Sequence, residues 1–239
     1  MTVFTIGHSN HSIETFINLL QQYGVTAIAD VRSSPYSRRF PQFNQVPLKE
    51  ALRTANIAYV YLGDNLGARP KDQSCYAQGM ARYDLIAATA SFAEGLNRII
   101  QGAKKYQISL MCAEQDPIIC HRAILICPHL QKIGLKIQHI RKNGELETHQ
   151  ILEERLLRLH NLDKLLPLSI ESDHERNCSK QLSLFDMNLY ESNSQQINQI
   201  SPSIPLEGLL DKAYQLQAEK IAYVEDKYTE KDQIHEQAS

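Results

Sequence analysis

The stretch that decides the fold runs from Ile108 to Ile126 and reads ISLMCAEQDPIICHRAILI. It opens with a short apolar run, breaks into a polar turn after Met111, and resumes with helical spacing from Ile118. A strand, a loop and the N-terminus of a helix are expected in that order. In an open α/β sheet, ligands bind in the crevice beyond the strand ends, and a helix N-terminus adds free N–H groups and positive partial charge. The polar residues of this turn are therefore candidates for a ligand site.

Short apolar runs alternate with helical stripes on both sides of this stretch. Strands are expected at Val3–Ile6, Val25–Val31, Ala58–Leu62, Ile108–Met111 and Leu135–Ile140. Helices are expected after Ser12 as far as Gly24, and at Pro47–Ala55, Asp84–Lys105, Ile118–Ile133 and His149–His160, with a polar loop at Gly63–Gln78. The alternation predicts an α/β fold with three layers, an open and mainly parallel sheet with helices on both faces.

Composition divides the chain into three parts. Residues 1–165 form the expected α/β domain, 166–205 a polar linker, and 206–239 a short amphipathic helix with an acidic tail. Residues 1–160 hold 18 Lys/Arg and 13 Asp/Glu, a surplus of five positive charges. Residues 161–239 hold 7 and 14, a surplus of seven negative charges. A weakly basic domain with a flexible acidic C-terminal tail is expected.

The chain shows no signal for secretion or for a membrane. It opens with Met1-Thr2-Val3-Phe4, which lacks the basic start and long apolar run of a secretory signal. No stretch approaches the roughly 20 apolar residues of a membrane helix. The five cysteines are therefore expected as reduced thiols in the cytoplasm, with no membrane partner.

Polar residues follow several of the expected strands, and parallel strands bring their C-terminal ends to one edge of a sheet. The candidate residues at this edge are His8, Ser9, Asp30, Arg32, Ser37, Arg38, Cys112, Glu114, Cys120, His121 and Arg122. Their convergence from independent strands is the strongest functional signal in the sequence.

Two kinds of role are assigned within this set. Arg32, Arg38 and Arg122 suit a phosphate or carboxylate because a guanidinium binds two oxygens at once. With them, Ser9, Asp30, Ser37, Cys112 and His121 are expected to contact the substrate. The alternative pairs Arg32 with Asp30 or Glu114 and leaves Arg38 and Arg39 in solvent.

His8 and Glu114 are candidates for proton transfer. Cys120 is a candidate nucleophile because His121, Arg122 and a helix N-terminus favour its thiolate. The alternative is an inert buried thiol.

Metal and cofactor chemistry receive less support. Cys112, Cys120, His121 and His8 could supply four ligands, but the spacing C-x7-C-H matches no common zinc pattern, so no metal is expected. No Walker glycine loop, G-x-G-x-x-G or G-x-S-x-G occurs, and no cofactor is expected. A C-x5-R phosphatase loop is also absent.

Four spaced motifs resemble the family called domain of unknown function 488. They are T-I-G-H-S at Thr5–Ser9, D-V-R-x-x-P-x-S-R at Asp30–Arg38, L-M-C-A-E-x-x-x-x-x-C-H-R at Leu110–Arg122, and H-I at His139–Ile140. The resemblance covers roughly residues 3–150. It implies a single cytoplasmic α/β domain from a bacterium or archaeon, and it implies no activity.

A separate motif lies in the expected linker. Gln181-Leu182-Ser183-Leu184-Phe185 resembles the peptide with which bacterial repair and replication proteins dock on the DNA sliding clamp. Such a peptide places Leu184 and Phe185 in apolar pockets, while Gln181 and Leu182 add further contacts. The alternative is that this apolar island folds back on the domain or arises by chance.

The leading hypothesis is an enzyme that binds a phosphate-bearing substrate, a nucleotide or nucleic acid, at the strand edge. The sliding clamp would recruit it to DNA during replication or repair. A non-catalytic binding module and Cys-dependent sulfur or redox chemistry remain as alternatives. The sequence does not name the substrate or the reaction.

Overall fold

The computed structural model describes residues 1–165 and 205–225. Its main sheet has six strands in the order β3-β2-β6-β1-β7-β8. They are β1 (Thr2–Gly7), β2 (Ala27–Asp30), β3 (Ala58–Tyr61), β6 (Ile108–Cys112), β7 (Lys136–Ile140) and β8 (Leu146–Thr148). All neighbours from β3 to β7 are parallel, and only the edge strand β8 is antiparallel to its neighbour. The predicted α/β fold with a mainly parallel sheet is confirmed.

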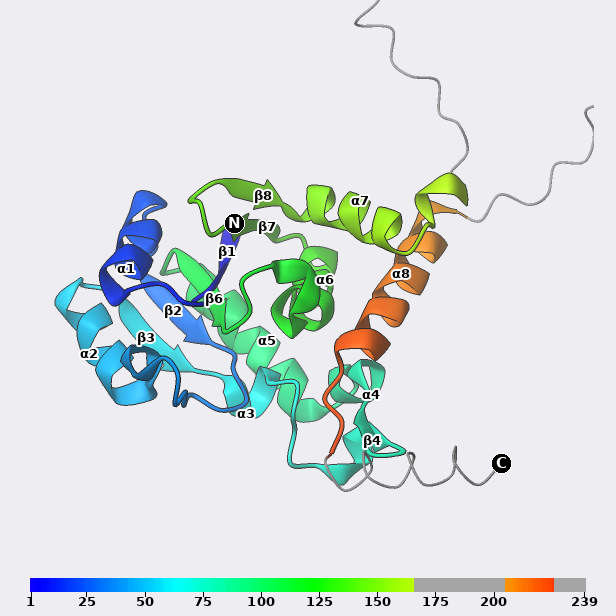
Figure 1. The fold of residues 1–239 in the computed structure, drawn as a ribbon, viewed down its shortest axis with the longest axis horizontal. Coiled ribbons are helices and arrows are strands. Elements are labelled where there is room, and N and C mark those ends of the chain that lie inside the picture. Colours follow the sequence, from blue (N-terminus) through cyan, green and yellow to red (C-terminus); the bar gives the residue numbers. More distant parts are fainter. Residues whose placement is uncertain (166–204, 226–239) are drawn as a thin grey trace, which may run out of the picture.

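Helices cover both faces of this sheet (Figure 1). One face packs against α1 (Ile13–Gln22) and α2 (Gln45–Thr54) through a core that includes Phe16, Phe43 and Leu48. The other face packs against α3 (Gly63–Leu66), α5 (Ala90–Ala103), α6 (Cys127–Lys132) and α7 (His149–Leu159). The three-layer arrangement leaves the C-terminal ends of the strands as the open edge.

The helix expected at Asp84–Lys105 is two helices, α4 (Tyr83–Ala87) and α5. Thr89 causes the break because its hydroxyl donates to the Ile86 carbonyl and accepts from the Phe92 N–H. These two bonds satisfy backbone groups at the end of one helix and the start of the next.

The prediction of a single helix at Ile118–Ile133 is also wrong. The chain forms a 3-10 turn at Pro117–Ile119, a π-helical segment at Arg122–Ile126 and then α6. Pro128 lacks the N–H that an α-helix would place on the Ile124 carbonyl, so the regular ladder cannot continue through it. Widened turns of this kind are frequent at functional sites.

Smaller elements complete the domain. The loop expected at 63–78 contains α3, a 3-10 turn at Gln73–Cys75 and strand β4 (Tyr76–Ala77), which pairs with β5 (Met80–Ala81). A turn at Asn143–Gly144 joins β7 to β8, a strand that the sequence did not predict, and Gly144 has a φ of +85°.

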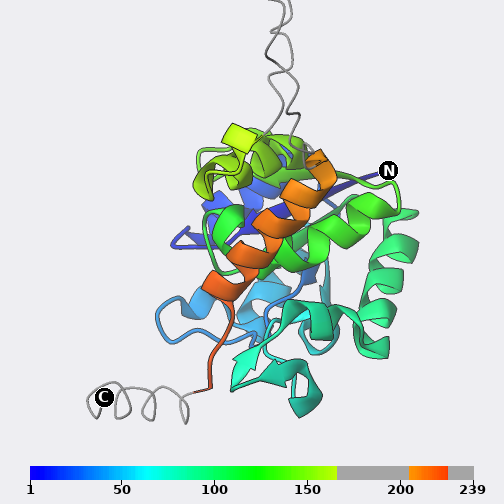
Figure 2. The same ribbon diagram turned by 90° about the vertical axis from the view of Figure 1, so that its right-hand side faces the viewer.

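The helix α8 (Leu206–Ile221) packs on the domain beside α7 and the π-helical segment (Figure 2). Leu209 and Ala213 are buried, and the Gln217 amide donates to the Ile118 carbonyl at 2.8 Å. Beyond α8, Val224 forms a bridge with Met80. The peptide at residues 181–185 lies outside the described residues. Within the described ranges, no helix is long and apolar enough to cross a membrane.

Candidate functional site

A cavity of about 1000 Å³ opens at the C-terminal ends of β1, β2 and β6. Of the residues predicted from the sequence, it is lined by His8, Ser9, Arg32, Ser37, Cys112, Glu114 and His121. The structure therefore brings together side chains from three strands and their loops. Asp30, Arg38, Cys120 and Arg122 are not part of this lining.

Gly7 allows β1 to approach the loop that follows β6. A Cβ atom at Gly7 would lie only 1.9 Å from the Glu114 carbonyl oxygen. Next to it, the backbone N–H groups of His8 and Ser9 donate to the carbonyls of Cys112 and Ala113, each at 2.9 Å. Only glycine fits this approach, which places His8 beside the Glu114 loop.

Arg32 is held in a buried ion pair with Asp30. Its Nη2 lies 2.6 Å from Asp30 Oδ2 and its Nε lies 2.9 Å from Oδ1. Nη2 also donates to the Phe43 carbonyl, and the Tyr59 hydroxyl donates to Asp30 Oδ2. The bidentate fork of Arg32 is thus occupied by protein groups, which is the alternative that the sequence left open.

His8 completes this wall of the cavity. Its Nδ1 lies 3.0 Å from the Ser9 carbonyl, which can only accept, so Nδ1 carries the proton. Its Nε2 then accepts from Arg32 Nη1 at 3.3 Å, and its ring stacks on Phe43 at 4.4 Å. Burial and the Arg32 charge lower the pKa of His8 to about 4. His8 is therefore a neutral hydrogen-bond acceptor at neutral pH.

Arg122 is fully buried beneath the loop after β6. It donates to the carbonyls of Glu114 and Gln115 at 2.8 and 3.3 Å, and to Thr5 Oγ1 at 3.4 Å. These bonds fix the loop backbone, so the guanidinium shapes the cavity floor from behind.

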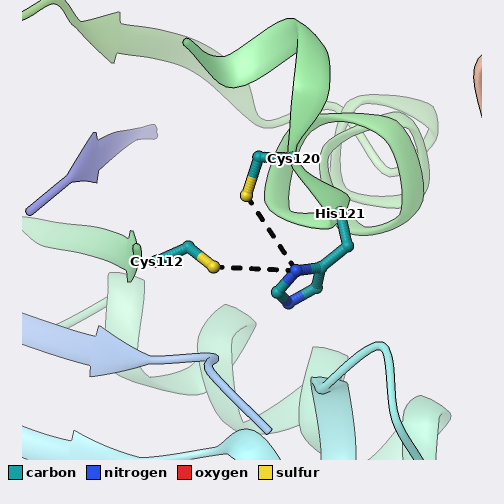
Figure 3. Close-up of side chains that lie close together, drawn as sticks. All are labelled: Cys112, Cys120 and His121. Carbon is teal, nitrogen blue, oxygen red and sulfur yellow. Dashed lines mark hydrogen bonds between the residues drawn. The ribbon is translucent and has the colours of Figure 1, made fainter. Parts of the chain in front are cut away.

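Two sulfurs and an imidazole meet at the end of β6 (Figure 3), and the Glu114 carboxylate joins them. Glu114 Oε2 lies 2.9 Å from Cys112 Sγ and 3.1 Å from Cys120 Sγ. His121 Nδ1 lies 3.7 and 3.9 Å from the same two sulfurs. Cys120 is not at a regular helix N-terminus: its backbone is extended, with φ −131° and ψ 136°, between the 3-10 turn and the π-helical segment.

The two thiols of this cluster have opposite proton affinities. Burial opposes the Cys120 thiolate, but the hydrogen bond with Cys112, the Arg122 charge and His121 together lower the pKa of Cys120. Burial and the neighbouring Cys120 sulfur raise the pKa of Cys112. Negative charge on this pair is therefore centred on Cys120.

Two cationic residues that line the cavity, Arg39 and Arg69, are not among the predicted site residues. Arg39 and Arg69 line the cavity, both are exposed, and neither forms an ion pair among residues 1–165 and 205–225. The Arg69 guanidinium lies 4.4 Å from the centre of the Tyr223 ring, and that of Arg39 lies 5.4 Å from the centre of the Phe40 ring. The sequence feature that could have identified Arg69 is its position in the polar loop that follows the third strand. Tyr223 carried none, because it comes from beyond the expected linker.

A model of the family described as domain of unknown function DUF488 matches residues 12–127. The match contains the second and third of the four motifs, and the first and fourth lie outside it. Comparison with curated proteins and with solved structures found no match.

Proposed function

We propose that the protein is an enzyme that binds a phosphate-bearing substrate, a nucleotide or nucleic acid, in the cavity at the strand edge. The observation that carries the proposal is the pair Arg39 and Arg69, two guanidinium groups without carboxylate partners in the described chain, at a cavity that ends on Glu114. A guanidinium with free donors binds phosphate oxygens in pairs.

Each wall of the cavity supports part of this function. Arg39 and Arg69 hold the phosphate, and the rings of Phe40 and Tyr223 beside them offer faces on which a base can stack. The neutral His8 forms a rigid wall that carries no competing charge. An anion is therefore drawn to the side of the cavity away from the carboxylate.

Glu114 is the group best placed to move a proton. It lines the cavity and is exposed to it. Desolvation at the cavity floor and the Cys120 sulfur raise its pKa, which brings a carboxyl group closer to the range useful for acid–base catalysis. His8 remains a candidate for the same role, although its only free lone pair faces Arg32.

The binding claim is tested by Arg39→Ala/Arg69→Ala against Arg53→Ala/Arg98→Ala, which removes the same charge from exposed positions outside the cavity. Hydrogen bonds to charged groups contribute about 1.5–3 kcal/mol each. Fluorescence anisotropy with labelled ATP and a labelled single-stranded oligonucleotide should show at least a tenfold loss of affinity for the first variant only. Equal affinities for the two variants would remove the anion site.

Catalysis is tested separately from binding. The full chain and Glu114→Gln are incubated with a panel of nucleotides and oligonucleotides, and the products are followed by mass spectrometry. An enzyme predicts a product with the wild type and far less with Glu114→Gln at similar binding. A panel that is bound but left unchanged supports the non-catalytic module instead.

We also propose that Gln181–Phe185 docks this protein on a bacterial sliding clamp. Support comes from the pentapeptide sequence and from its position outside the matched residues 12–127. Clamp pull-down should recover the wild type and lose Leu184→Ala/Phe185→Ala, while Leu206→Ala serves as the control. Equal recovery of all three proteins would exclude docking through this peptide.

A further inference from the structure

We propose that Cys112 Sγ, Cys120 Sγ and His121 Nδ1 bind one Zn²⁺-class ion whose fourth coordination position faces the cavity. The three ligand atoms lie within 4.8 Å of one another in the structure. All three residues are buried, with relative exposures of 3%, 1% and 8%.

The distances suit tetrahedral coordination. Zn–S bonds of about 2.3 Å and Zn–N bonds of about 2.0–2.1 Å at tetrahedral angles place sulfur and nitrogen about 3.6 Å apart. His121 Nδ1 lies 3.7 Å from the Cys112 sulfur and 3.9 Å from the Cys120 sulfur. Each sulfur therefore needs to approach Nδ1 by only a few tenths of an ångström. The two sulfurs, which lie within 4.8 Å of each other, need a separation of about 3.8 Å in the same geometry.

The tautomer of His121 leaves the correct nitrogen free. Its Nε2 lies 3.0 Å from the Val31 carbonyl, which accepts a hydrogen bond and cannot donate one. In the neutral ring the proton is thus on Nε2, and Nδ1, the atom that would coordinate the ion, faces the two sulfurs (Figure 3). A backbone carbonyl that fixes the far nitrogen of the ring is the usual support of a histidine ligand.

The composition of the cluster favours an ion over an inert thiol pair. Apolar cores seldom hold several ionisable groups in contact unless these are paired or coordinate a metal. Here two thiols face one imidazole nitrogen, and Glu114 Oε2 lies within 3.1 Å of both sulfurs. Thiolate and imidazole are the ligands that Zn²⁺ prefers.

The chain spacing does not oppose this site. Close ligand pairs two to four residues apart arise when one turn supplies both ligands. Here Cys112 ends β6, whereas Cys120 and His121 belong to the turn before the π-helical segment. Although Cys120 and His121 are consecutive, Cys120 Sγ lies 3.9 Å from His121 Nδ1, so this turn brings both ligand atoms to one point.

The fourth position would be open to the cavity. Cys112 and His121 line the cavity together with Glu114, while Cys120 closes the site from behind. Catalytic zinc sites keep such a position for water or substrate, and Glu114 would stand beside it as a proton acceptor. This catalytic use rests on the proposed function, but binding of the ion does not.

The test is a Co²⁺ titration of the reduced, chelator-treated full chain. One equivalent should bind with a sulfur-to-cobalt charge-transfer band and the visible bands of tetrahedral cobalt, and Zn²⁺ should displace it. Cys120→Ser and His121→Ala should lose the spectrum. Cys127→Ser, which removes another buried thiol of the same core, should keep it.

Several results would overturn the site. One is a folded, reduced wild type that takes up well under one equivalent, and another is a Cys127→Ser variant that loses as much cobalt as Cys120→Ser. Circular dichroism checks the folding of each variant. If Cys120→Ser is unfolded, the cobalt stoichiometry of the wild type alone decides whether the site exists. Arg39→Ala/Arg69→Ala should bind cobalt like the wild type, so loss of the metal site and loss of the anion site are seen separately.

Discussion

At the scale of single residues, the arginines show why charge alone does not identify a ligand site. Arg32 and Arg122 are buried, and other groups of the protein accept hydrogen bonds from their guanidinium nitrogens. Arg39 and Arg69 are exposed on the cavity and keep their donors available to a ligand. Arg32 and Arg122 hold the structure around the cavity, and Arg39 and Arg69 are proposed to bind the ligand.

The Asp30–Arg32 pair should be structural. In Asp30→Asn the buried guanidinium loses its compensating charge, and breaking a buried pair from one side costs about 3–5 kcal/mol. Denaturant unfolding should show a loss of this size for Asp30→Asn. Glu50→Gln breaks the exposed pair with Arg53 and should change stability little. Similar losses of unfolding free energy in Asp30→Asn and Glu50→Gln would contradict a structural role for the buried Asp30–Arg32 pair.

At the scale of elements, a buried hydrogen-bonded chain ties α7 and α8 to the sheet. Thr5 Oγ1 lies 2.8 Å from His139 Nδ1, and His139 Nε2 lies 3.0 Å from His149 Nδ1. His149 Nε2 lies 2.9 Å from the Tyr214 hydroxyl, which donates to Glu153 Oε1. Every contact is satisfied when both imidazoles are neutral with the proton on Nε2. His139 therefore joins the helices to the sheet.

This chain predicts a loss of stability in mild acid. Burial lowers the pKa of His149 to about 4, whereas an unfolded histidine titrates near pH 6.5. Between pH 4 and pH 6.5 the unfolded state binds more protons than the folded state. The contribution of His149 to the free energy of unfolding is therefore largest above about pH 6.5, and it decreases as the pH drops toward 4.

Thermal unfolding between pH 7.5 and 4.5 measures this effect. The wild type should lose melting temperature across the window, and His149→Gln, which cannot titrate there, should lose less. His8 and His139 also have lowered pKa values and keep part of the slope in both proteins. Identical slopes would show that His149 is not coupled to folding.

The sequence predicted elements better than their interruptions. Apolar runs placed five parallel strands correctly because strand burial is a local pattern. The sequence pattern did not predict the break at Thr89 or the π-helical segment before Pro128. At Thr89 a side-chain hydroxyl ends one helix and starts the next, and at Pro128 a missing N–H interrupts the α-helical hydrogen bonds. The strand-edge position of His8 and Glu114 was predictable, since parallel strands share an edge. The pairing of Arg32 was not, because it depends on distances that spacing does not encode.

At the scale of the whole molecule, the C-terminal segment after the undescribed residues 166–204 forms part of the cavity wall. Residues 221–224 line the cavity after α8 has crossed the domain (Figure 2). The Ala81 N–H donates to the Tyr223 carbonyl at 2.8 Å, which fixes this segment beside β5. The cavity is therefore complete only when the helix from beyond the matched domain is docked.

Tyr223→Ala should weaken ligand binding without unfolding the domain. Its ring supports the Arg69 guanidinium, and cation–π and base-stacking contacts contribute about 0.5–3 kcal/mol. We expect a several-fold loss of oligonucleotide affinity by fluorescence anisotropy. Tyr106→Ala, at an exposed position outside the cavity, is the matched control. A control that loses as much affinity would contradict a specific contribution from this segment.

Amide chemical-shift mapping tests whether a phosphate-bearing ligand binds where β1, β2 and β6 end. The full chain, labelled with ¹⁵N and deuterium, is titrated with a 5′-phosphorylated dinucleotide. We expect saturable shifts concentrated at residues 8–9, 32–40, 68–69, 113–115 and 221–224. Shifts confined to the opposite end of the strands, or no shifts at saturating ligand, would contradict binding at this cavity.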